Sequence, residues 1–342
     1  MGWPGCVAHA DAHAATGSWF NGEVKRSSRH LQAAALTAFA SAAACSHPSP
    51  APAPSPAAPP ASAAPTSPSD TILFRKPSRF GEVFVVQNGP QRCLTLDTPK
   101  DIQSCIVPAE PGKVVHEYVR YLTAGILVAP DAPRTLMIGL GGGSVVGIMR
   151  SAAPGIRFDI VEINDAVVEA ARRWFGITEC ESLHVHVGDG RAFVEGAHGA
   201  WDMIVLDAFS SEGIPPHLGT EEFLRAIRGR TSPDGAVVAN LWNTDPVLYK
   251  NMLRTYREVF PATYVFEGRE SGNVIVISLQ GELDGGCTTI RARARDARWS
   301  ARLSFDLGAV AAVCTPIAAV DLAGSRVLRD AEWKGMGDGG VR

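Results

Sequence analysis

The sequence carries little net charge and lacks the cysteine pairs that bind zinc or exchange disulfides. Its 32 Lys and Arg residues nearly balance 35 Asp and Glu residues, for a net charge of -3. This balance argues against a nucleic acid or an acidic membrane as the principal partner. None of the 7 cysteines belongs to a C-x-x-C pair, so we expect no metal and interpret most of them as isolated small hydrophobic residues. The basic residues from Arg291 to Arg302 are interpreted as a solvated helix face.

The N-terminal segment also lacks an apolar run long enough to span a bilayer. Lys25 and Arg26 precede the alanine-rich run Leu31 to Ala44, which is short, weakly apolar and followed by Cys45. A charged start, a short apolar run and small residues before a cysteine are typical of a lipoprotein signal, which we assign to residues 1–45. We therefore expect an exported protein with a lipid anchor at Cys45. The alternative is a disordered leader on a cytoplasmic protein.

Residues 46–70 consist almost entirely of Pro, Ala and Ser, and this composition predicts an extended linker. Short apolar runs separated by turn formers then predict a small antiparallel β-lobe over residues 71–112, with a turn at Gln87 to Pro90. In this lobe Cys93 and Cys105 can face each other across neighbouring strands. Whether they form a disulfide depends on the redox compartment.

Residues 113–280 are interpreted as one nucleoside-binding catalytic domain. A helix is expected from about Val114 to Ala129, and apolar strands then alternate with helices up to Leu279. The alternation predicts an α/β fold with a seven-stranded, mostly parallel Rossmann-like sheet, whose last two strands form an antiparallel hairpin at its edge. Ligands of such sheets bind beyond the carboxyl ends of the strands. Residues 281–342 form a C-terminal extension to which we assign no chemistry.

A glycine-rich turn follows the first strand of this domain. Gly139, Gly141, Gly142 and Gly143 interrupt an apolar run just before a helix opens. Glycines here let the backbone turn sharply and approach a ligand closely. Glu162 ends the next strand about 20 residues later, which is the spacing of a carboxylate that binds both hydroxyls of a nucleoside ribose. The turn and the acid together predict a nucleoside site.

Two further acids follow the next two strands at the same edge of the expected sheet. Asp189, before Gly190, fits an adenine amino group, and the combination with the turn points to an adenosyl-sulfonium ligand of the S-adenosylmethionine type. Asp207 is predicted to hold an amine nucleophile and accept its proton for attack on the carbon next to sulfur. There is an alternative for each acid. Asp189 would only cap the helix starting at Arg191, and Asp207 would only cap the loop from Phe209 to Leu218.

At these residues the chain resembles the spermidine synthase (polyamine aminopropyltransferase) family, in particular its divergent bacterial branch with Asp-Ala-Phe-Ser-Ser at Asp207. The resemblance covers roughly residues 82–279 and implies a transferase fold with decarboxylated S-adenosylmethionine as cosubstrate, putrescine or a relative as acceptor, and a homodimer. It implies that Gln103 and His116 contact the nucleoside or the amine from the β-lobe side. It also implies that Glu162 binds the ribose, Asp189 the adenine, and that Asp207 is catalytic.

Two departures from the family pattern remove negative charge from the expected site. The family's turn carries an aspartate that binds the aminopropyl ammonium, and Gly142 stands at that place. A second acid of the catalytic loop corresponds to Ser210. A turn aspartate would repel the carboxylate of intact S-adenosylmethionine. With Gly142 this repulsion is gone, so we expect that the pocket can accept the intact form.

Three hypotheses follow. The first is an aminopropyltransferase acting on a polyamine. The second is a methyltransferase that uses intact S-adenosylmethionine on an unknown acceptor, which Gly142 favours. The third is a non-catalytic binder of adenosyl ligands, because an exported domain would find little of either cosubstrate outside the cell.

Overall fold

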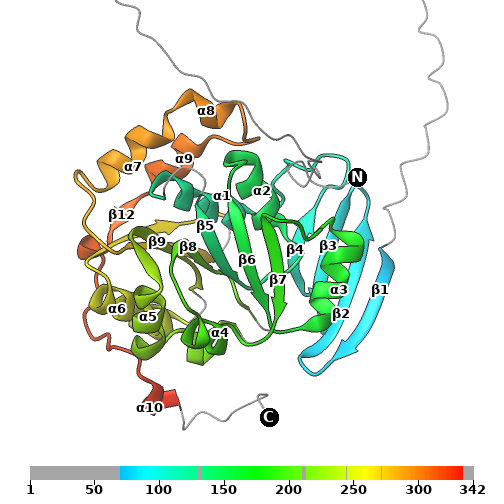
Figure 1. The fold of residues 1–342 in the computed structure, drawn as a ribbon, viewed down its shortest axis with the longest axis horizontal. Helices are drawn as coiled ribbons and strands as arrows, with labels where there is room; N and C mark the ends of the chain where they lie inside the picture. Colours follow the sequence, from blue (N-terminus) through cyan, green and yellow to red (C-terminus); the bar gives the residue numbers. More distant parts are fainter. Residues whose placement is uncertain (1–69, 130–132, 210–212, 244, 271, 334–342) are drawn as a thin grey trace, which may run out of the picture. The chain divides into compact units, whose positions relative to one another are not determined.

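The computed structural model describes residues 70–129, 133–209, 213–243, 245–270 and 272–333. The predicted signal, Cys45 and nearly all of the predicted linker lie outside the described residues, as does Ser210. The described residues form a small antiparallel sheet, a large mixed sheet with helices on both faces, and a helical C-terminal segment (Figure 1).

The small sheet is a four-stranded antiparallel meander. Its order is β1-β2-β3-β4, with β1 at Thr71–Ser78, β2 at Gly81–Asn88, β3 at Gln91–Leu96 and β4 at Ile102–Ile106. The predicted turn at Gly89 joins β2 to β3, with a positive φ of 52° at that glycine. Cys93 and Cys105 are register partners on β3 and β4 and form a disulfide. The β-lobe predicted from the alternating apolar runs is therefore present.

The large sheet confirms the predicted α/β class. Its order is β12-β10-β11-β9-β8-β5-β6-β7, and the pairs from β9 to β7 are parallel. The strands are β5 (Arg134–Ile138), β6 (Arg157–Glu162), β7 (Leu183–Val187), β8 (Trp201–Leu206), β9 (Thr231–Trp242), β10 (Ala262–Glu267), β11 (Asn273–Leu279) and β12 (Thr315–Pro316). The hairpin of β10 and β11 is antiparallel as predicted, and the short β12 from the C-terminal extension adds an eighth strand outside it.

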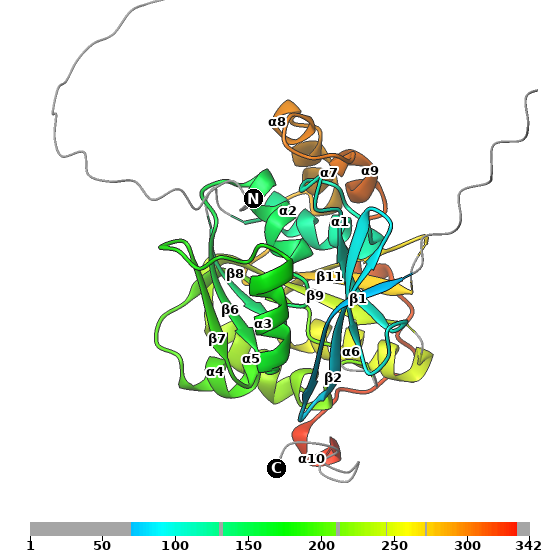
Figure 2. The same cartoon turned by 90° about the vertical axis from the view of Figure 1, so that its right-hand side faces the viewer.

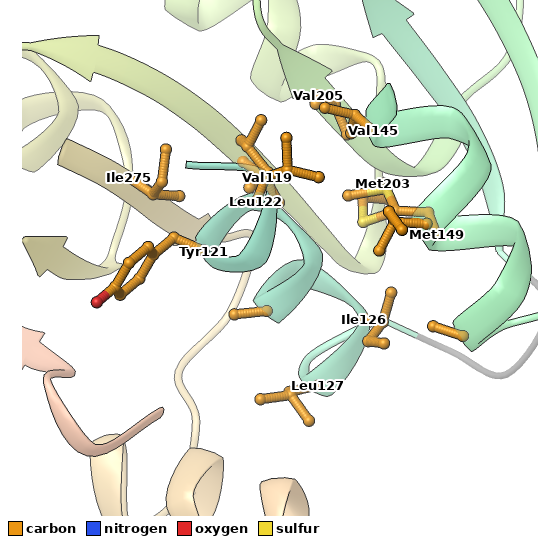
Figure 3. Packing of buried hydrophobic residues seen from close by; sticks show 14 of the residues in the cluster. Val119, Tyr121, Leu122, Ile126, Leu127, Val145, Met149, Met203, Val205 and Ile275 are labelled. Carbon is orange, nitrogen blue, oxygen red and sulfur yellow. The ribbon is translucent and has the colours of Figure 1, made fainter. Parts of the chain in front are cut away.

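Both faces of this sheet are buried, and for this reason its strands are apolar at successive positions. On β5, Leu136 and Ile138 pack into one core cluster, whereas Met137 packs into the cluster on the opposite face. Figure 3 shows that opposite face, where Leu122 lies near Met203. The helices that cover the sheet are α1 (Glu117–Thr123), η1 (Ala124–Leu127), α2 (Ser144–Ala152), α3 (Asp165–Trp174), α4 (Gly190–Gly196), η2 (Pro216–Leu218), α5 (Glu221–Gly229) and α6 (Pro246–Val259).

Helix α3 joins the two sheets. Ala166 and Ala170 on α3 pack with Val83 and Val85 on β2 in a core cluster between the β-lobe and the large sheet. Figure 2 shows α3 beside the β-lobe. Asn164 caps the start of this helix, because its side chain accepts a hydrogen bond from the backbone nitrogen of Ala166 at 3.0 Å. The β-lobe is thus held next to α3, the helix that follows β6.

The helix expected at Val114 to Ala129 is shorter than predicted. His116 has an extended backbone, with φ -101° and ψ 135°, so α1 starts at Glu117 and passes into the 3₁₀ turn η1. Glu117 is buried and accepts hydrogen bonds from the backbone nitrogens of Arg269 and Glu270 at 3.1 and 2.8 Å. Its carboxylate therefore holds the turn between β10 and β11.

The C-terminal extension packs against one face of the large sheet and its helices, in the core cluster that contains Met137. It contains α7 (Cys287–Ala294), α8 (Ala297–Ser300), α9 (Leu307–Ala312), η3 (Ile317–Ala319) and α10 (Asp330–Trp333), with a disulfide between Cys287 and Cys314. The basic run is not simply a solvated face, because Arg291, Arg293 and Arg302 donate to backbone carbonyl oxygens at 2.8 to 3.0 Å. No helix among the described residues is long and apolar enough to cross a membrane.

Candidate active site

The ends of four parallel strands are tied together through their backbones. The backbone nitrogen of Gly139 donates to Val161 at 2.9 Å, and that of Gly188 donates to the carbonyl oxygen of Glu162 at 3.0 Å. The backbone nitrogen of Asp207 donates at 2.9 Å to the carbonyl oxygen of the last residue of β5. The segments that follow β8, β5, β6 and β7 therefore lie side by side, as the sequence predicted for Asp207, Gly139, Glu162 and Asp189.

The glycine turn requires glycine at two of its predicted positions. Gly139 has φ +95°, and a Cβ there would lie 2.3 Å from the carbonyl oxygen of Asp207. Gly143 has φ +71°, and a Cβ there would lie 2.4 Å from the Ile177 side chain. Side chains at both positions would be strained, and one at Gly139 would also collide with the backbone of Asp207. Gly141 also has a positive φ, of +51°.

Gly142 is closely covered by its neighbours. A Cβ at this position would lie 2.9 Å from two ring carbons of Phe175 and 3.1 Å from Oγ of Ser104. The volume that an acidic side chain would need is thus taken up by the end of α3 and by β4. The packing around Gly142 therefore disfavours an acidic side chain at this position.

Glu162 is buried at the end of β6, directly beneath the turn. One carboxylate oxygen accepts from the backbone nitrogen of Leu140 and the other from that of Asn164, both at 2.9 Å. Burial raises the pKa of Glu162, and these backbone hydrogen bonds oppose that shift. Backbone amides of Gly141 and Ile163 also contact this carboxylate, so the acid ties the glycine turn to the end of β6.

Asp189 caps α4 as the structural alternative proposed, and it also pairs with a histidine. Its Oδ1 accepts from the backbone nitrogen of Ala192 at 2.8 Å, while Oδ2 lies 3.0 Å from Nε2 of His217. The hydrogen bond with His217, followed by that of the Ala192 amide, lowers the pKa of Asp189. The neighbouring Gly190 has no room for a side chain, because a Cβ would lie 2.4 Å from Ile138. The acid is therefore ionised and held in one orientation at the strand edge.

Asp207 follows β8, and Asn240 is the side chain that donates to it among the described residues. Nδ2 of Asn240 donates to its Oδ1 at 2.9 Å, and Nδ2 of Asn273 donates to Oδ1 of Asn240 at 2.9 Å. Burial raises the pKa of Asp207 to about 7, and the Asn240 hydrogen bond partly offsets that rise. A carboxyl group with a pKa near neutrality, next to a glycine turn, is suited to accept a proton.

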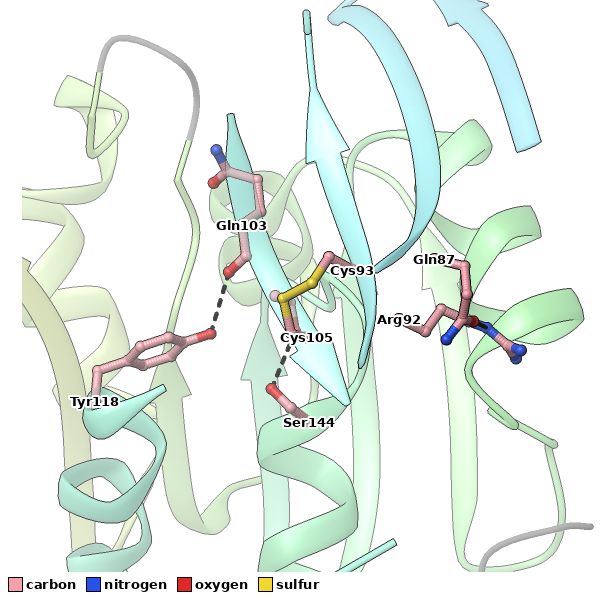
Figure 4. Close-up of a disulfide and its surroundings, with 8 residues drawn as sticks. Gln87, Arg92, Cys93, Gln103, Cys105, Tyr118 and Ser144 are labelled. Carbon is pink, nitrogen blue, oxygen red and sulfur yellow. Dashed lines mark hydrogen bonds between the residues drawn. A yellow bond between two sulfur atoms is a disulfide. The ribbon is translucent and has the colours of Figure 1, made fainter. Parts of the chain in front are cut away.

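The β-lobe and α1 supply the other predicted contacts. His116 is stacked on Tyr118, with ring centroids 6.1 Å apart, and burial lowers its pKa. No group among the described residues forms a hydrogen bond with the buried Nε2 of His116, so a ligand can supply a partner. The side chain of Gln103 donates to Asp101 at 3.3 Å, and its backbone carbonyl oxygen accepts from the Tyr118 hydroxyl at 3.4 Å (Figure 4).

Sequence reasoning missed Asn240 and Tyr118. Asn240 is a polar residue in the otherwise apolar stretch of β9, and that pattern alone marks a side chain that needs a buried partner. Tyr118 lies in the first turn of α1, directly after Glu117. An aromatic residue at helical spacing is usually interpreted as part of the hydrophobic core. The described residues contain no cluster of three or more His, Cys, Asp or Glu side chains that is able to hold a metal ion.

Comparison with known proteins assigns the chain to a family. The family model described as "Spermine/spermidine synthase domain" matches residues 112–267. A polyamine aminopropyltransferase of Vibrio vulnificus is 37% identical over 216 residues, which cover 61% of this chain and 72% of the relative. The chain therefore belongs to the spermine/spermidine synthase family, as its motifs indicated.

Two further comparisons bear on the fold and on one alternative function. The crystal structure of a probable spermidine synthase from Corynebacterium glutamicum has a TM-score of 0.61 at 18% identity, covering 76% of this chain and 96% of that one, which shows a shared fold. A human eEF1A lysine and N-terminal methyltransferase is 27% identical over 184 residues, which cover 46% of this chain and 26% of that protein.

Proposed function

We propose that this protein transfers an aminopropyl group from decarboxylated S-adenosylmethionine to a polyamine such as putrescine. The observation that carries the proposal is the Asp207 carboxyl group at the end of β8, beside the glycine turn, with a pKa raised to about 7. Membership of the spermine/spermidine synthase family and the polyamine aminopropyltransferase relative support the reaction class.

The residues present fit an adenosyl-sulfonium cosubstrate. The backbone turn at Gly139 has no room for a Cβ, and the Glu162 carboxylate lies beneath it. The buried Nε2 of His116 has no hydrogen-bond partner within the part of the chain that the structure describes. In the proposed roles, Glu162 accepts from the ribose, Asp189 faces the adenine, and Gln103 and His116 close the site from the β-lobe. Gly141, Gly142, Gly143 and Gly190 let the backbone come close.

Asp207 would position the acceptor amine and take its proton. The nitrogen then forms a bond to the carbon next to sulfur, the carbon–sulfur bond breaks, and methylthioadenosine leaves without charge. Because the sulfonium group is already activated, positioning and charge supply most of the rate enhancement. Asn240 fixes the Asp207 carboxyl group for this step through the 2.9 Å hydrogen bond.

Product analysis tests the proposal. The full-length protein is incubated with putrescine and decarboxylated S-adenosylmethionine, and methylthioadenosine and spermidine are measured by mass spectrometry. Asp207→Asn should lower turnover by about 100-fold or more, as the loss of a general base does. Asp202→Asn, on the same strand but bonded to Arg134 and Ser232, is the matched control and should retain turnover. Equal turnover in the two variants would contradict the role of Asp207.

A methyltransferase is the second candidate, because Gly142 removes an acid that would repel the carboxylate of intact S-adenosylmethionine. The local similarity to a named methyltransferase supports keeping it. The two reactions leave different by-products: transfer of a methyl group leaves S-adenosylhomocysteine, whereas transfer of the propyl chain leaves methylthioadenosine. Detection of S-adenosylhomocysteine alone would replace the first proposal with the second.

We also propose that the protein is exported and anchored through Cys45. The disulfides Cys93–Cys105 and Cys287–Cys314 support an oxidising compartment, where disulfides persist. Cys45→Ser should move the protein from the membrane fraction to the soluble fraction of cells. Unchanged fractionation would refute the anchor and leave the enzymatic proposal intact.

A further inference from the structure

Three hydroxyl groups from three separate elements meet beside the glycine turn. Ser104 on β4 and Ser144 at the start of α2 have their Oγ atoms 3.0 Å apart. The Tyr118 hydroxyl from α1 donates at 3.4 Å to the backbone carbonyl oxygen of Gln103, the residue that precedes Ser104 on β4. Figure 4 shows Tyr118 and Ser144 approaching β4 from the two helices. We call Ser104, Tyr118 and Ser144 the hydroxyl wall.

The wall lies directly against the turn. A Cβ on Gly142 would be 3.1 Å from Oγ of Ser104, and a Cβ on Gly141 would be 3.4 Å from Cβ of the same serine. Both serines are buried. Because the ring of Phe175 fills the other side of Gly142, the polar groups next to this part of the turn come from the wall.

The hydroxyl wall is electrically neutral. Burial and the nearby charge of Asp207 raise the pKa of Tyr118, so its hydroxyl keeps its proton at neutral pH. Serine does not ionise, and each hydroxyl can both donate and accept a hydrogen bond. A neutral wall can therefore face an ammonium group as acceptor and a carboxylate as donor. A fixed acid at the same place would attract the first and repel the second.

We propose that the hydroxyl wall contacts the terminal end of the sulfonium cosubstrate, and that its neutrality lets the site bind the cosubstrate with its carboxylate as well as without it. This inference rests on the proposed function, because it assumes an adenosyl-sulfonium ligand with its propyl chain directed towards Asp207. The proposed cosubstrates are thus both decarboxylated and intact S-adenosylmethionine.

Calorimetric titration of the full-length protein with three ligands tests the inference. Methylthioadenosine probes the adenosine half, and the intact and decarboxylated sulfonium compounds probe the terminal group. For the wild type we expect the two sulfonium dissociation constants to lie within about tenfold of each other. The key variant is Ser144→Asp, because an acid at the first residue of α2 is favoured by the helix N-terminus and should fold.

Ser144→Asp should shift the ratio of affinities by about tenfold to a hundredfold towards the decarboxylated form, the range of one charged hydrogen bond. Ser144→Asn has nearly the same shape without the charge, so it should leave the ratio close to that of the wild type. Ser104→Asp, with Ser104→Asn as its control, repeats the test from β4. Methylthioadenosine binding to each variant reports that the adenosine half is still formed.

The outcomes separate the two proposals. If methylthioadenosine does not bind the wild type, the adenosine site fails and the proposed function fails with it. If it binds, and the wild type still excludes the intact form by more than a hundredfold, only the inference is overturned. Equal ratios for the Asp and Asn variants at both positions overturn it as well.

Discussion

The amide nitrogen of Asn240 lies 2.9 Å from Oδ1 of Asp207, and the orientation of that amide is set by Asn273. Because Nδ2 of Asn273 donates to the Asn240 oxygen, Asn240 presents its NH₂ group to the carboxyl group of Asp207. The hydrogen bond favours the ionised carboxylate, whereas burial favours the protonated acid. Asp207 therefore titrates where a small change in its surroundings alters its protonation at physiological pH.

The first prediction is a pH profile. Protonated Asp207 has no free capacity to accept the amine proton, so kcat/KM should fall as pH drops below about 7, the raised pKa of this group. The acidic limb should lie at lower pH for kcat than for kcat/KM, because a bound sulfonium cation favours the ionised carboxylate. Initial rates from pH 5.5 to 9 test both points. A flat profile would contradict the assignment.

The second prediction concerns Asn240→Ala. Removal of the donor should raise the pKa of Asp207 further and move the acidic limb of the kcat/KM profile to higher pH. Asn251→Ala is a matched control, since Asn251 is another buried asparagine that instead binds the backbone nitrogen of Arg326. The acidic limb of the kcat/KM profile of Asn251→Ala should stay at the pH of the wild type. Identical profiles for the two variants would show that Asn240 is not coupled to Asp207.

The third prediction sets stability against activity. The folded-state pKa of Asp207 lies above its unfolded value of 3.8, so the stability contributed by the protonated acid is lost as the pH rises from there to about 7, and the loss is complete above that pH. Asp207→Asn removes that loss and should stabilise the protein by about 1–3 kcal/mol at pH 8, with no gain near pH 4. Thermal unfolding at the two pH values measures this. A loss of stability at pH 8 would argue against a desolvated carboxylate.

The fourth prediction concerns packing at Gly142. Even a methyl group there meets Phe175 at 2.9 Å, so Gly142→Ala should destabilise the fold by about 1–3 kcal/mol. A second change, Phe175→Leu, should recover part of the loss, because it removes the ring that the new Cβ contacts. Denaturant unfolding of both single variants and the double variant gives the interaction energy. Purely additive effects would mean that Phe175 does not occupy the volume beside Gly142.

The fifth prediction compares the disulfides Cys93–Cys105 and Cys287–Cys314. Replacement of Cys93 and Cys105 by alanine opens a link between residues 12 positions apart and should cost about 2–4 kcal/mol. It should also weaken binding of adenosyl ligands, because Gln103 and Ser104 lie on the strand that the disulfide holds. Replacement of Cys287 and Cys314 is the control, and it should cost stability while leaving ligand affinity unchanged. Equal effects on affinity would remove the special role of the first pair.

The residues that follow the ends of the parallel strands were predictable, because each is marked by a sequence pattern in its own neighbourhood. A strand that ends in glycines, and acids placed directly after later strands, identified Gly139, Glu162, Asp189 and Asp207, since parallel strands end at one edge. The sequence could not show that Glu162 also binds the turn's own amides or that Asp189 pairs with His217. Those contacts depend on side chains brought together from distant parts of the chain.

The hydroxyl wall and the C-terminal extension were beyond local pattern reading. Ser104 and Ser144 are 40 residues apart, and nothing in either neighbourhood indicates the other. The extension forms short helices without strong periodicity, and its two-residue strand β12 is defined only by its pairing with β10. Arg191 donates to both carboxylate oxygens of Asp330, 139 residues away, a contact that depends entirely on the tertiary fold.

The cross-strand ties among Asp207, Gly139 and Glu162 run through peptide groups, so the spacing of these strand ends is set by the backbone, and of these three residues only Glu162 adds a side-chain contact to the turn. Exchange of the projecting groups can redirect the chemistry while the strand ends keep their spacing. The chain is similar both to a polyamine aminopropyltransferase and to a methyltransferase, two reaction types that differ in the group transferred and not in the need for such strand ends.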